Sequence, residues 1–294
     1  MLAITENINP DTYEIDLQSG AEIARLINAE DKKVALAVEK ILPQIGAAID
    51  VIAEKLRRGG RLAYFGSGTS GRIGILDASE MPPTYGVRGD MIQAYISGGE
   101  KAVRYAVENA EDSAEFAAAD LADFAPTSDD AVVAISASGN PQYTLEVLRL
   151  ARQKGVTTIA VTSNPDAKFK PYADIFLCAV VGPEAVAGSS RMKAGTAQKM
   201  IVNMLTTGAM IRIGKTYHNY MVDLQIHNEK LRERAVRYVC DICGVAAPQA
   251  EKVLDAAGNV KTACVMIVKQ CDKAEAEKLL AQNDGILRRI LEDK

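Results

Sequence analysis

Apolar residues change their spacing along the chain, and the changes divide it into three parts. From about residue 21 to residue 56, apolar positions recur at helical spacing, which predicts helices with a break near Pro43. Short continuous apolar runs follow, and these predict buried strands at 61–66, 91–97, 130–138, 156–163 and 173–181. From about residue 227 the spacing is helical again, in short pieces.

Helical patterns separate most of the predicted strands. They cover about 70–80, 112–124 and 140–154, and a longer one covers 192–213. Strands that alternate with helices predict a parallel sheet covered on both faces. The predicted fold class is therefore α/β, a parallel sheet sandwiched by helices, with N-terminal helices and a small all-helical C-terminal module. The predicted domains are a helical arm at 1–50, the sheet domain at 51–220 and the helical module at 221–294.

Composition and charge narrow the possible functions. Of the 294 residues 48% are hydrophobic and 24% charged, as in ordinary globular proteins, and the net charge of −4 without a broad basic tract argues against nucleic acid as a partner. No apolar run approaches the ~18 residues of a membrane span, and the first residues do not form a signal peptide. The 5 cysteines have no disulfide framework spacing, so we expect a reduced, cytoplasmic protein with no membrane partner.

Neither a metal nor a nucleotide cofactor is expected. The chain has 2 histidines, and Cys240 and Cys243 lie in a helical pattern without the second pair that a structural zinc site needs. The glycines of "GSGTSG" (66–71) fit the dinucleotide fingerprint, but the second predicted strand ends in "YISGG", without the acid that binds the ribose. The Gly-Lys-Ser/Thr ending of a nucleoside triphosphate loop is also missing from this segment.

Three polar segments follow or end predicted strands, and each combines glycine with hydroxyl residues: "GSGTSG" (66–71), "SASGN" (136–140) and "GSSRMKAGT" (188–196). Ligands of such sheets bind beyond the carboxyl ends of the strands. The first and third segments also open predicted helices, whose N–H groups suit an anion. We therefore expect a site for a phosphate monoester. Its predicted ligands are Ser67, Thr69, Ser70, Ser136, Ser138, Ser189, Ser190 and Lys193.

Longer motifs closely resemble one family. They are "GSGTSGRIGILDASEMPPTYG" (66–86), "AVENAEDS" (106–113) and "VVGPEAVAGSSRMKAGTAQKMIVNML" (180–205), and they resemble the N-acetylmuramic acid 6-phosphate etherases of the sugar isomerase (SIS) domain superfamily. The resemblance implies a lyase that cleaves the lactyl ether of a phosphorylated amino sugar, releasing D-lactate, in cell-wall recycling. It implies no cofactor, and SIS domains generally form homodimers. Two acids of the family correspond to Glu80 and Glu111.

The residues alone leave other functions open. A non-catalytic SIS-type sugar-phosphate sensor would keep the phosphate loops without needing both acids. A transcription regulator would need a helix-turn-helix head, and an aldose–ketose isomerase would share the abstraction of a C2 proton. Taken singly, Glu80 is an acid near a helix end and Glu111 an acid at a helix start, where the helix dipole stabilises it. The resemblance favours Glu80 as general acid and Glu111 as general base, but the sequence does not decide between them.

Overall fold

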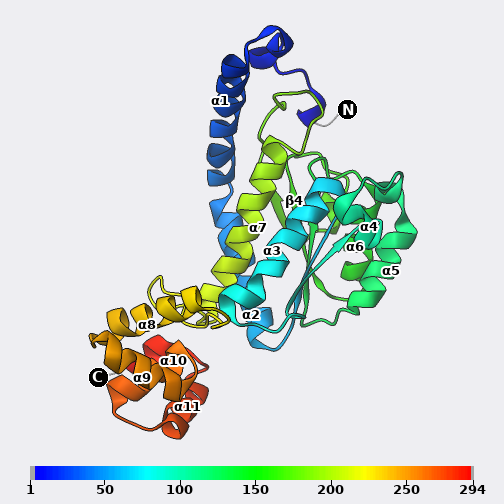
Figure 1. The fold of residues 1–294 in the computed structure, drawn as a ribbon. Helices are drawn as coiled ribbons and strands as arrows, with labels where there is room; N and C mark the ends of the chain where they lie inside the picture. Colours follow the sequence, from blue (N-terminus) through cyan, green and yellow to red (C-terminus); the bar gives the residue numbers. More distant parts are fainter. Residues whose placement is uncertain (1–3, 293–294) are drawn as a thin grey trace. The chain divides into compact units, whose positions relative to one another are not determined.

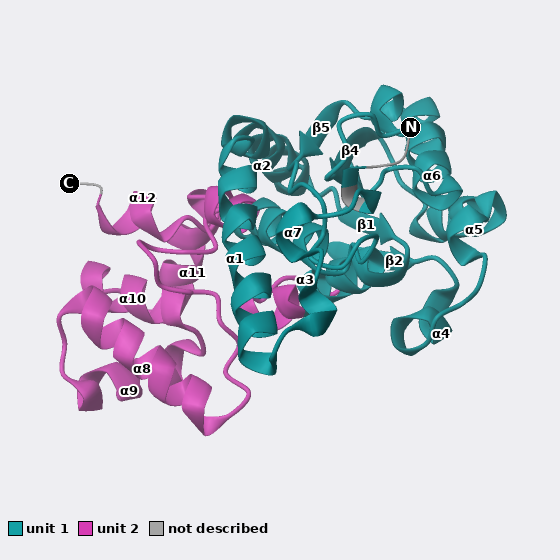
Figure 2. Cartoon of the chain, turned by 90° about the horizontal axis from the view of Figure 1, so that it is seen from above, with its two compact units in different colours: residues 1–79, 90–207 teal, residues 80–89, 208–294 magenta. Residues whose placement is uncertain are grey.

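The computed structural model describes residues 4–292, and the chain divides into two compact units. The first unit consists of residues 1–79 and 90–207, and the second consists of residues 80–89 and 208–294 (Figure 2). The domain boundaries predicted from the sequence stay predictions.

A five-stranded parallel sheet forms the centre of the first unit, as predicted (Figure 1). Its strands are β1 (Leu62–Gly66), β2 (Ile92–Ile96), β3 (Ala131–Ile135), β4 (Thr157–Thr162) and β5 (Ile175–Cys178), in the spatial order β2-β1-β3-β4-β5. All residues of β1 and β3 are buried, which explains why these strands are continuous apolar runs. Gly66 pairs with Ile96 on one side and with Ile135 on the other, so three neighbouring strands end level.

Helices cover both faces of this sheet (Figure 1). The helices of this part of the chain are α1 (Gly20–Glu39), α2 (Leu42–Arg57), α3 (Gly68–Tyr85), α4 (Gly99–Arg104), α5 (Ala114–Phe124), α6 (Gln142–Gln153) and α7 (Lys193–Arg212), with short 3-10 turns at Ile4–Glu6, Pro10–Thr12, Ile15–Leu17, Ala110–Asp112 and Lys170–Tyr172. On one face, Leu121 of α5 and Val147 of α6 pack with Phe65 of β1. On the opposite face, Tyr64 of β1 contacts α3 and α7.

The predicted break near Pro43 is confirmed. α1 ends at Glu39, and α2 begins at Leu42 with Pro43 in its first turn. Proline suits this position because the first N–H groups of a helix have no intrahelical acceptor.

A buried carboxylate fixes α3 against the sheet. Asp77 of α3 accepts hydrogen bonds from Tyr64 at 2.9 Å and from Asn203 and Thr206 of α7 at 2.5 and 2.9 Å. Burial raises the pKa of Asp77, although these three donors act in the opposite direction. The network joins a strand and two helices, so the middle of α3 has a fixed position beside β1.

α3 continues beyond the point where the sequence predicts its end. The predicted helix ends at residue 80, before Pro82 and Pro83, yet the helix runs through both prolines to Tyr85. Each proline removes one backbone donor, but its fixed φ is compatible with a helix. Met81 and Tyr85 are buried on this last part, and their burial favours the longer helix despite the lost hydrogen bonds.

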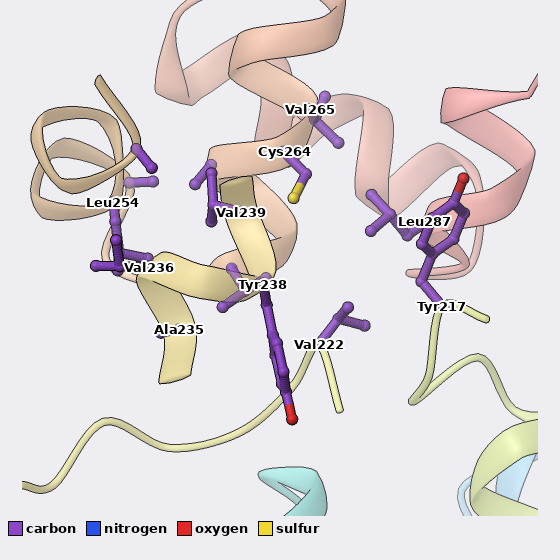
Figure 3. Packing of buried hydrophobic residues seen from close by; sticks show 14 of the residues in the cluster. Tyr217, Val222, Ala235, Val236, Tyr238, Val239, Leu254, Cys264, Val265 and Leu287 are labelled. Carbon is purple, nitrogen blue, oxygen red and sulfur yellow. The ribbon is translucent and has the colours of Figure 1, made fainter. Parts of the chain in front are cut away.

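The second unit is all-helical in its C-terminal part, as predicted, and has its own core (Figure 3). Its helices are α8 (Glu229–Cys243), α9 (Ala247–Ala257), α10 (Val260–Lys269), α11 (Lys273–Gln282) and α12 (Leu287–Leu291). The core includes Val222, Val239, Leu254, Cys264 and Leu287, which are 3% exposed or less. Because the helices are short, this shared burial rather than helix propensity stabilises the unit.

Candidate active site

The loop between β1 and α3 forms one wall of a pocket. β1 ends at Gly66, and α3 begins two residues later at Gly68. A Cβ atom at Gly66 would lie 2.7 Å from the backbone nitrogen of Gly71, so only glycine permits this sharp turn. The turn directs the N-terminus of α3, with its N–H groups and partial positive charge, toward the space beyond the strand ends.

The loop between β3 and α6 forms a second wall. Ser136 accepts a hydrogen bond from the backbone N–H of Gly139 at 3.0 Å, and Ser138 accepts one from that of Asn140 at 3.3 Å. Asn164, which follows β4, donates to the carbonyl of Ser138 at 2.8 Å. These bonds hold the loop in one shape beside the first wall, because β1 and β3 are neighbours that end level.

A cavity of about 470 Å³ lies at these loops and collects most of the predicted site residues. The predicted residues that line it are Ser67, Thr69, Ser70, Glu111, Ser136, Ser138 and Ser190. Lining residues that the sequence did not single out include Glu6, Asp112, Asn140 and Thr144. No lysine, arginine or histidine is among the described residues that line the cavity. An anion bound there would therefore be held by hydroxyl and N–H donors and a helix N-terminus, without a fixed positive charge.

Two acidic side chains line the cavity from one short turn. Glu111 and Asp112 belong to the turn Ala110–Asp112, which directly precedes α5. Ser113 caps the start of α5. Its hydroxyl accepts a hydrogen bond from a backbone N–H of the first turn and donates one to Glu115 at 2.9 Å. The helix start therefore does not need Glu111 as a cap, and its carboxylate is available to the cavity.

The segment before α7 contributes Ser190 to the cavity but not Ser189. The N-terminus of α7 is capped by the protein itself, because the carboxylate of Glu184 accepts the backbone N–H groups of Lys193 and Ala194 at 2.8 and 2.9 Å. Glu184 is fully buried, and burial raises its pKa. The expectation that this helix start is open to a ligand anion is wrong, since Glu184 occupies it.

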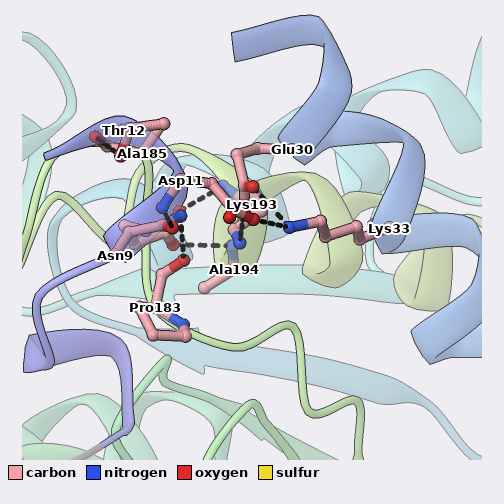
Figure 4. A network of polar contacts seen from close by, with 10 residues as sticks. Asn9, Asp11, Thr12, Glu30, Lys33, Pro183, Ala185, Lys193 and Ala194 are labelled. Atoms are coloured by element: carbon pink, nitrogen blue, oxygen red, sulfur yellow. Dashed lines mark hydrogen bonds and ion pairs between the residues drawn. The ribbon is translucent and has the colours of Figure 1, made fainter. Parts of the chain in front are cut away.

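Lys193 is held in a buried ion pair (Figure 4) and does not line the cavity. Its side chain is 1% exposed, and its ammonium lies 2.5 Å from the carboxylate of Glu30 on α1, which also pairs with Lys33. Burial alone would raise the pKa of Glu30, but hydrogen bonds from Lys193, Lys33 and Asn9 outweigh it and hold the pKa below its ordinary value. Lys193 thus fastens α1 to the start of α7, which is not the ligand-binding role that the sequence suggested.

Contacts that are distant in sequence hold the N-terminal segment in place (Figure 4). Asn9 donates to the carbonyl of Pro183 at 3.3 Å, and Thr12 donates to that of Ala185 at 2.8 Å. These bonds fasten the segment that carries Glu6, which lines the cavity. In the sequence, Asn9 precedes a proline, which is typical of a helix start. This pattern does not predict that the segment lines a pocket.

Glu80 does not line the cavity. It is an exposed residue of α3, and it follows Gly68 by twelve positions, which is about 18 Å along a helix. Glu111 therefore lines the cavity together with the loops at 66–71 and 136–140, here called the serine-rich loops, whereas Glu80 lies farther along α3 and does not line it.

Residues 4–292 contain neither a metal-binding cluster nor a membrane-spanning helix. No group of three or more His, Cys, Asp or Glu side chains is arranged to hold a metal ion in this part of the chain. No helix there is long and apolar enough to cross a bilayer. Independence from cofactors stays a prediction.

Family models match the sheet-containing part of the chain. A model of the glucokinase regulatory protein N-terminal SIS domain matches residues 44–152, and a model of the SIS domain matches residues 102–208.

Curated relatives match nearly the whole chain. An N-acetylmuramic acid 6-phosphate etherase from Escherichia coli O17:K52:H18 (strain UMN026 / ExPEC) is 51% identical over 290 residues, which is 98% of this chain and 97% of the relative. The protein of the same name from Escherichia coli strain K12 / DH10B is 50% identical over the same shares.

A solved structure supports the fold. Phosphoheptose isomerase from Neisseria gonorrhoeae superimposes with a TM-score of 0.51 over 65% of this chain and 98% of that chain. The two sequences are 17% identical, so the likeness shows the fold alone.

Proposed function

Because this chain belongs to the N-acetylmuramic acid 6-phosphate etherase family of SIS-domain lyases, we propose that its cavity binds the 6-phosphate at the serine-rich loops and that the lactyl ether is cleaved beside Glu111. The products are N-acetylglucosamine 6-phosphate and D-lactate. The observation that carries the proposal is that hydroxyl donors from two neighbouring strand ends and the carboxylate of Glu111 line one cavity of about 470 Å³.

The chemistry requires proton transfer at two different atoms of the sugar. Opening of the ring gives an aldehyde at C1, which makes the C2 proton acidic. A base removes that proton, and the C3–oxygen bond breaks while an acid protonates the departing lactate oxygen. Water then adds to C3 of the unsaturated aldehyde, and C2 regains a proton. In the overall reaction, the ether and one water molecule give the C3 alcohol of the sugar and the hydroxy acid lactate, with no net oxidation or reduction.

The phosphate anchor consists of neutral donors. The hydroxyls of Ser67, Thr69 and Ser70 lie at the N-terminus of α3, whose partial positive charge favours an anion, and those of Ser136 and Ser138 lie across the cavity wall formed after β3. A phosphate monoester offers only acceptor oxygens when fully ionised, so hydroxyl and N–H groups match it. The anchor uses binding energy remote from the reacting carbons to hold them near Glu111.

Glu111 is the proposed C2 base, and Glu80 is the proposed acid for the departing lactate oxygen. Since Glu80 lies about 18 Å along α3 from the loop, we assign it to the site of a second copy of the chain in a homodimer. Leu76 lies one turn before Glu80 on the same helix face and is 51% exposed. An exposed leucine beside a proposed catalytic glutamate supports the view that this face meets another molecule.

The cellular setting follows from the substrate. A phosphorylated amino sugar carries charge that a bilayer does not pass, so an enzyme for it acts in the compartment where it is made. Together with the cysteine usage, this supports a cytoplasmic enzyme of cell-wall recycling.

The first expected result is release of D-lactate in heavy-oxygen water, without added metal or nicotinamide. Elimination followed by hydration transfers solvent oxygen to C3 of the sugar product and leaves the lactate unlabelled. Mass spectrometry of both products measures this. Label in the lactate would contradict elimination, and tight binding of the substrate without any lactate would instead indicate a sugar-phosphate sensor.

The second expected result concerns the shared site. Glu80→Gln and Glu111→Gln homodimers should each be inactive, but a mixture refolded together should recover about a quarter of wild-type activity, because half of the dimers contain one site with both glutamates. Lactate release before and after mixing measures this. A mixture that stays inactive, although mass spectrometry detects heterodimers, would mean that both glutamates act from one chain.

A further inference from the structure

Two buried polar atoms lie next to the serine-rich loops without a partner. Among the described residues, Ser163 Oγ and Gln198 Nε2 are the buried side-chain polar atoms that make no hydrogen bond. The backbone N–H of Ser163 donates to Ala137, in the loop after β3, at 3.1 Å. Gln198 Oε1 accepts the hydroxyl of Ser70, in the loop after β1, at 3.0 Å. A buried donor without an acceptor is costly, so the Gln198 amide calls for an explanation.

The direction of each internal hydrogen bond decides what a serine can offer to a ligand. A hydroxyl has one proton and two lone pairs, so a serine that accepts a bond from the protein keeps its proton for the cavity. A serine that spends its proton on the protein presents only lone pairs, which repel an ionised phosphate. Protein groups that donate hydrogen bonds to the serine hydroxyls therefore leave the hydroxyl protons free to bind an anion.

Ser136 and Ser138 already have this arrangement. Each accepts a backbone N–H, from Gly139 and Asn140 respectively, and a backbone N–H has no other role than donor. Their own protons are therefore free to point into the cavity.

Ser67 has the same arrangement through a side chain. Ser97 follows β2, is 2% exposed, and donates its hydroxyl to that of Ser67 at 2.7 Å. The backbone N–H of Ser97 donates to the carbonyl of Gly66 at 3.0 Å, which fixes Ser97 directly behind the loop. Ser67 therefore accepts a hydrogen bond from Ser97 and keeps its own hydroxyl proton for the cavity.

Ser70 would also accept a hydrogen bond from the protein, like the other three serines, if the side-chain amide of Gln198 were rotated by about 180° about its terminal torsion. Gln198 is 1% exposed on α7, and its terminal torsion is soft, with two orientations that exchange the oxygen and the nitrogen. In the turned orientation Nε2 donates to Ser70, Oε1 takes the position that has no partner in place of the donor, and the Ser70 proton becomes available to the cavity.

We propose that Gln198 and Ser97 are positioning residues of the phosphate site: by donating hydrogen bonds to Ser70 and Ser67, they turn both hydroxyl protons toward the bound anion. The inference rests on the proposed phosphate anchor and deepens it. It makes the site an array of donors with no acceptor facing the ligand from these serines, which suits a fully ionised phosphate group.

Double-variant cycles test the proposal through binding, without turnover. The probes are inorganic phosphate and N-acetylglucosamine 6-phosphate, measured by calorimetry with the full chain. Gln198→Met and Ser97→Ala should each weaken binding of both probes by about 10- to 100-fold, the value of one hydrogen bond to a charged group. In the Ser70→Ala background, Gln198→Met should have little further effect, and in the Ser67→Ala background the same should hold for Ser97→Ala.

Controls separate positioning from a loss of structure. Thr206→Val removes a buried hydroxyl from the same helix as Gln198, but that hydroxyl bonds Asp77, so phosphate binding should be unchanged. With the substrate, Gln198→Met should raise KM and leave kcat near wild type, because the phosphate contact is the same in ground and transition states.

Each outcome of the cycles has one meaning. Losses that add in either double variant would overturn the proposal for that pair, since the residue would then act by another route. Binding of both probes by the wild type together with additive losses would leave the phosphate anchor intact and reject only the positioning role. A wild type that binds neither probe would reject the anchor and the positioning role together.

Discussion

Glu111→Gln should lower the rate of D-lactate release by about 10²- to 10⁴-fold, the usual contribution of one general acid or base. Glutamine keeps the size of the side chain but cannot take the C2 proton. Binding of N-acetylglucosamine 6-phosphate should change little, because the proposed phosphate anchor lies in the serine-rich loops and not at Glu111. The measurements are steady-state kinetics of lactate release and calorimetric titration with the product.

Isotope exchange separates the roles of the two glutamates. In deuterated water, Glu80→Gln should still exchange the C2 proton, because it lacks only the acid proposed to assist departure of lactate. Glu111→Gln should neither exchange that proton nor release lactate. The reverse pattern would exchange the roles, and full turnover in both variants would exclude these residues from the mechanism.

Glu115→Gln is the matched control for this experiment. Glu115 lies four residues after Glu111, accepts a hydrogen bond from Ser113 and does not line the cavity. Its substitution should leave lactate release near the wild-type rate. A comparable loss in this variant would mean that disturbance of the start of α5, rather than proton transfer, explains the effect at Glu111.

Glu30→Gln should lower the free energy of unfolding by about 3–5 kcal/mol, because it leaves the buried ammonium of Lys193 without its counter-charge. Both side chains are 3% exposed or less, so water cannot replace the lost partner. Urea denaturation followed by circular dichroism measures the difference. The double variant Glu30→Gln/Lys193→Met removes both charges and should recover most of the loss.

The effect of Glu30 should depend on pH in one direction. Hydrogen bonds hold the pKa of Glu30 below its ordinary value of 4.5, so its contribution to stability is complete above pH 4.5 and is lost as the pH falls through its lowered pKa. The wild type and Glu30→Gln should therefore converge in stability in acid. A constant difference between them at low pH would contradict the ion pair as the cause.

An exposed pair provides the control for this result. Glu54 pairs with Arg58 one turn along α2, and both side chains are well exposed to solvent. Glu54→Gln should hardly change the unfolding midpoint, because water and salt screen such pairs. If Glu54→Gln and Glu30→Gln destabilised the protein equally, burial would not be the source of the effect.

The parts of the site that the sequence predicted are those that local patterns specify. Buried apolar runs identify the strands, and a parallel sheet requires that their carboxyl ends share one edge. Ser67 and Ser136 therefore lie at the same edge of the sheet, and they meet at one cavity because β1 and β3 are neighbours, an order that the strand pattern does not give. The sequence did not predict that α3 continues to Tyr85. Prolines disfavour a helix interior, but burial of the side chains beyond them stabilises the longer helix by more than the prolines cost.

The parts that the sequence did not predict depend on contacts across long separations. Lys193 pairs with Glu30 across 163 positions, and nothing near either residue indicates that one neutralises the other. Glu184 likewise caps a helix that begins nine residues later, where a serine-rich segment gave the appearance of an open anion site. Lys193 and the start of α7 both looked available to a ligand, and the protein uses both to join its own elements.

The neutral character of the phosphate anchor has a consequence for product release. Substrate and sugar product carry the same phosphate, so a contact that orients the substrate also holds the product. A lysine or arginine in the cavity lining would prolong the stay of the product as much as that of the substrate. With hydroxyl and N–H donors, and no cation among the described lining residues, the proposed site would align the sugar without a charge–charge attraction that slows release of the product.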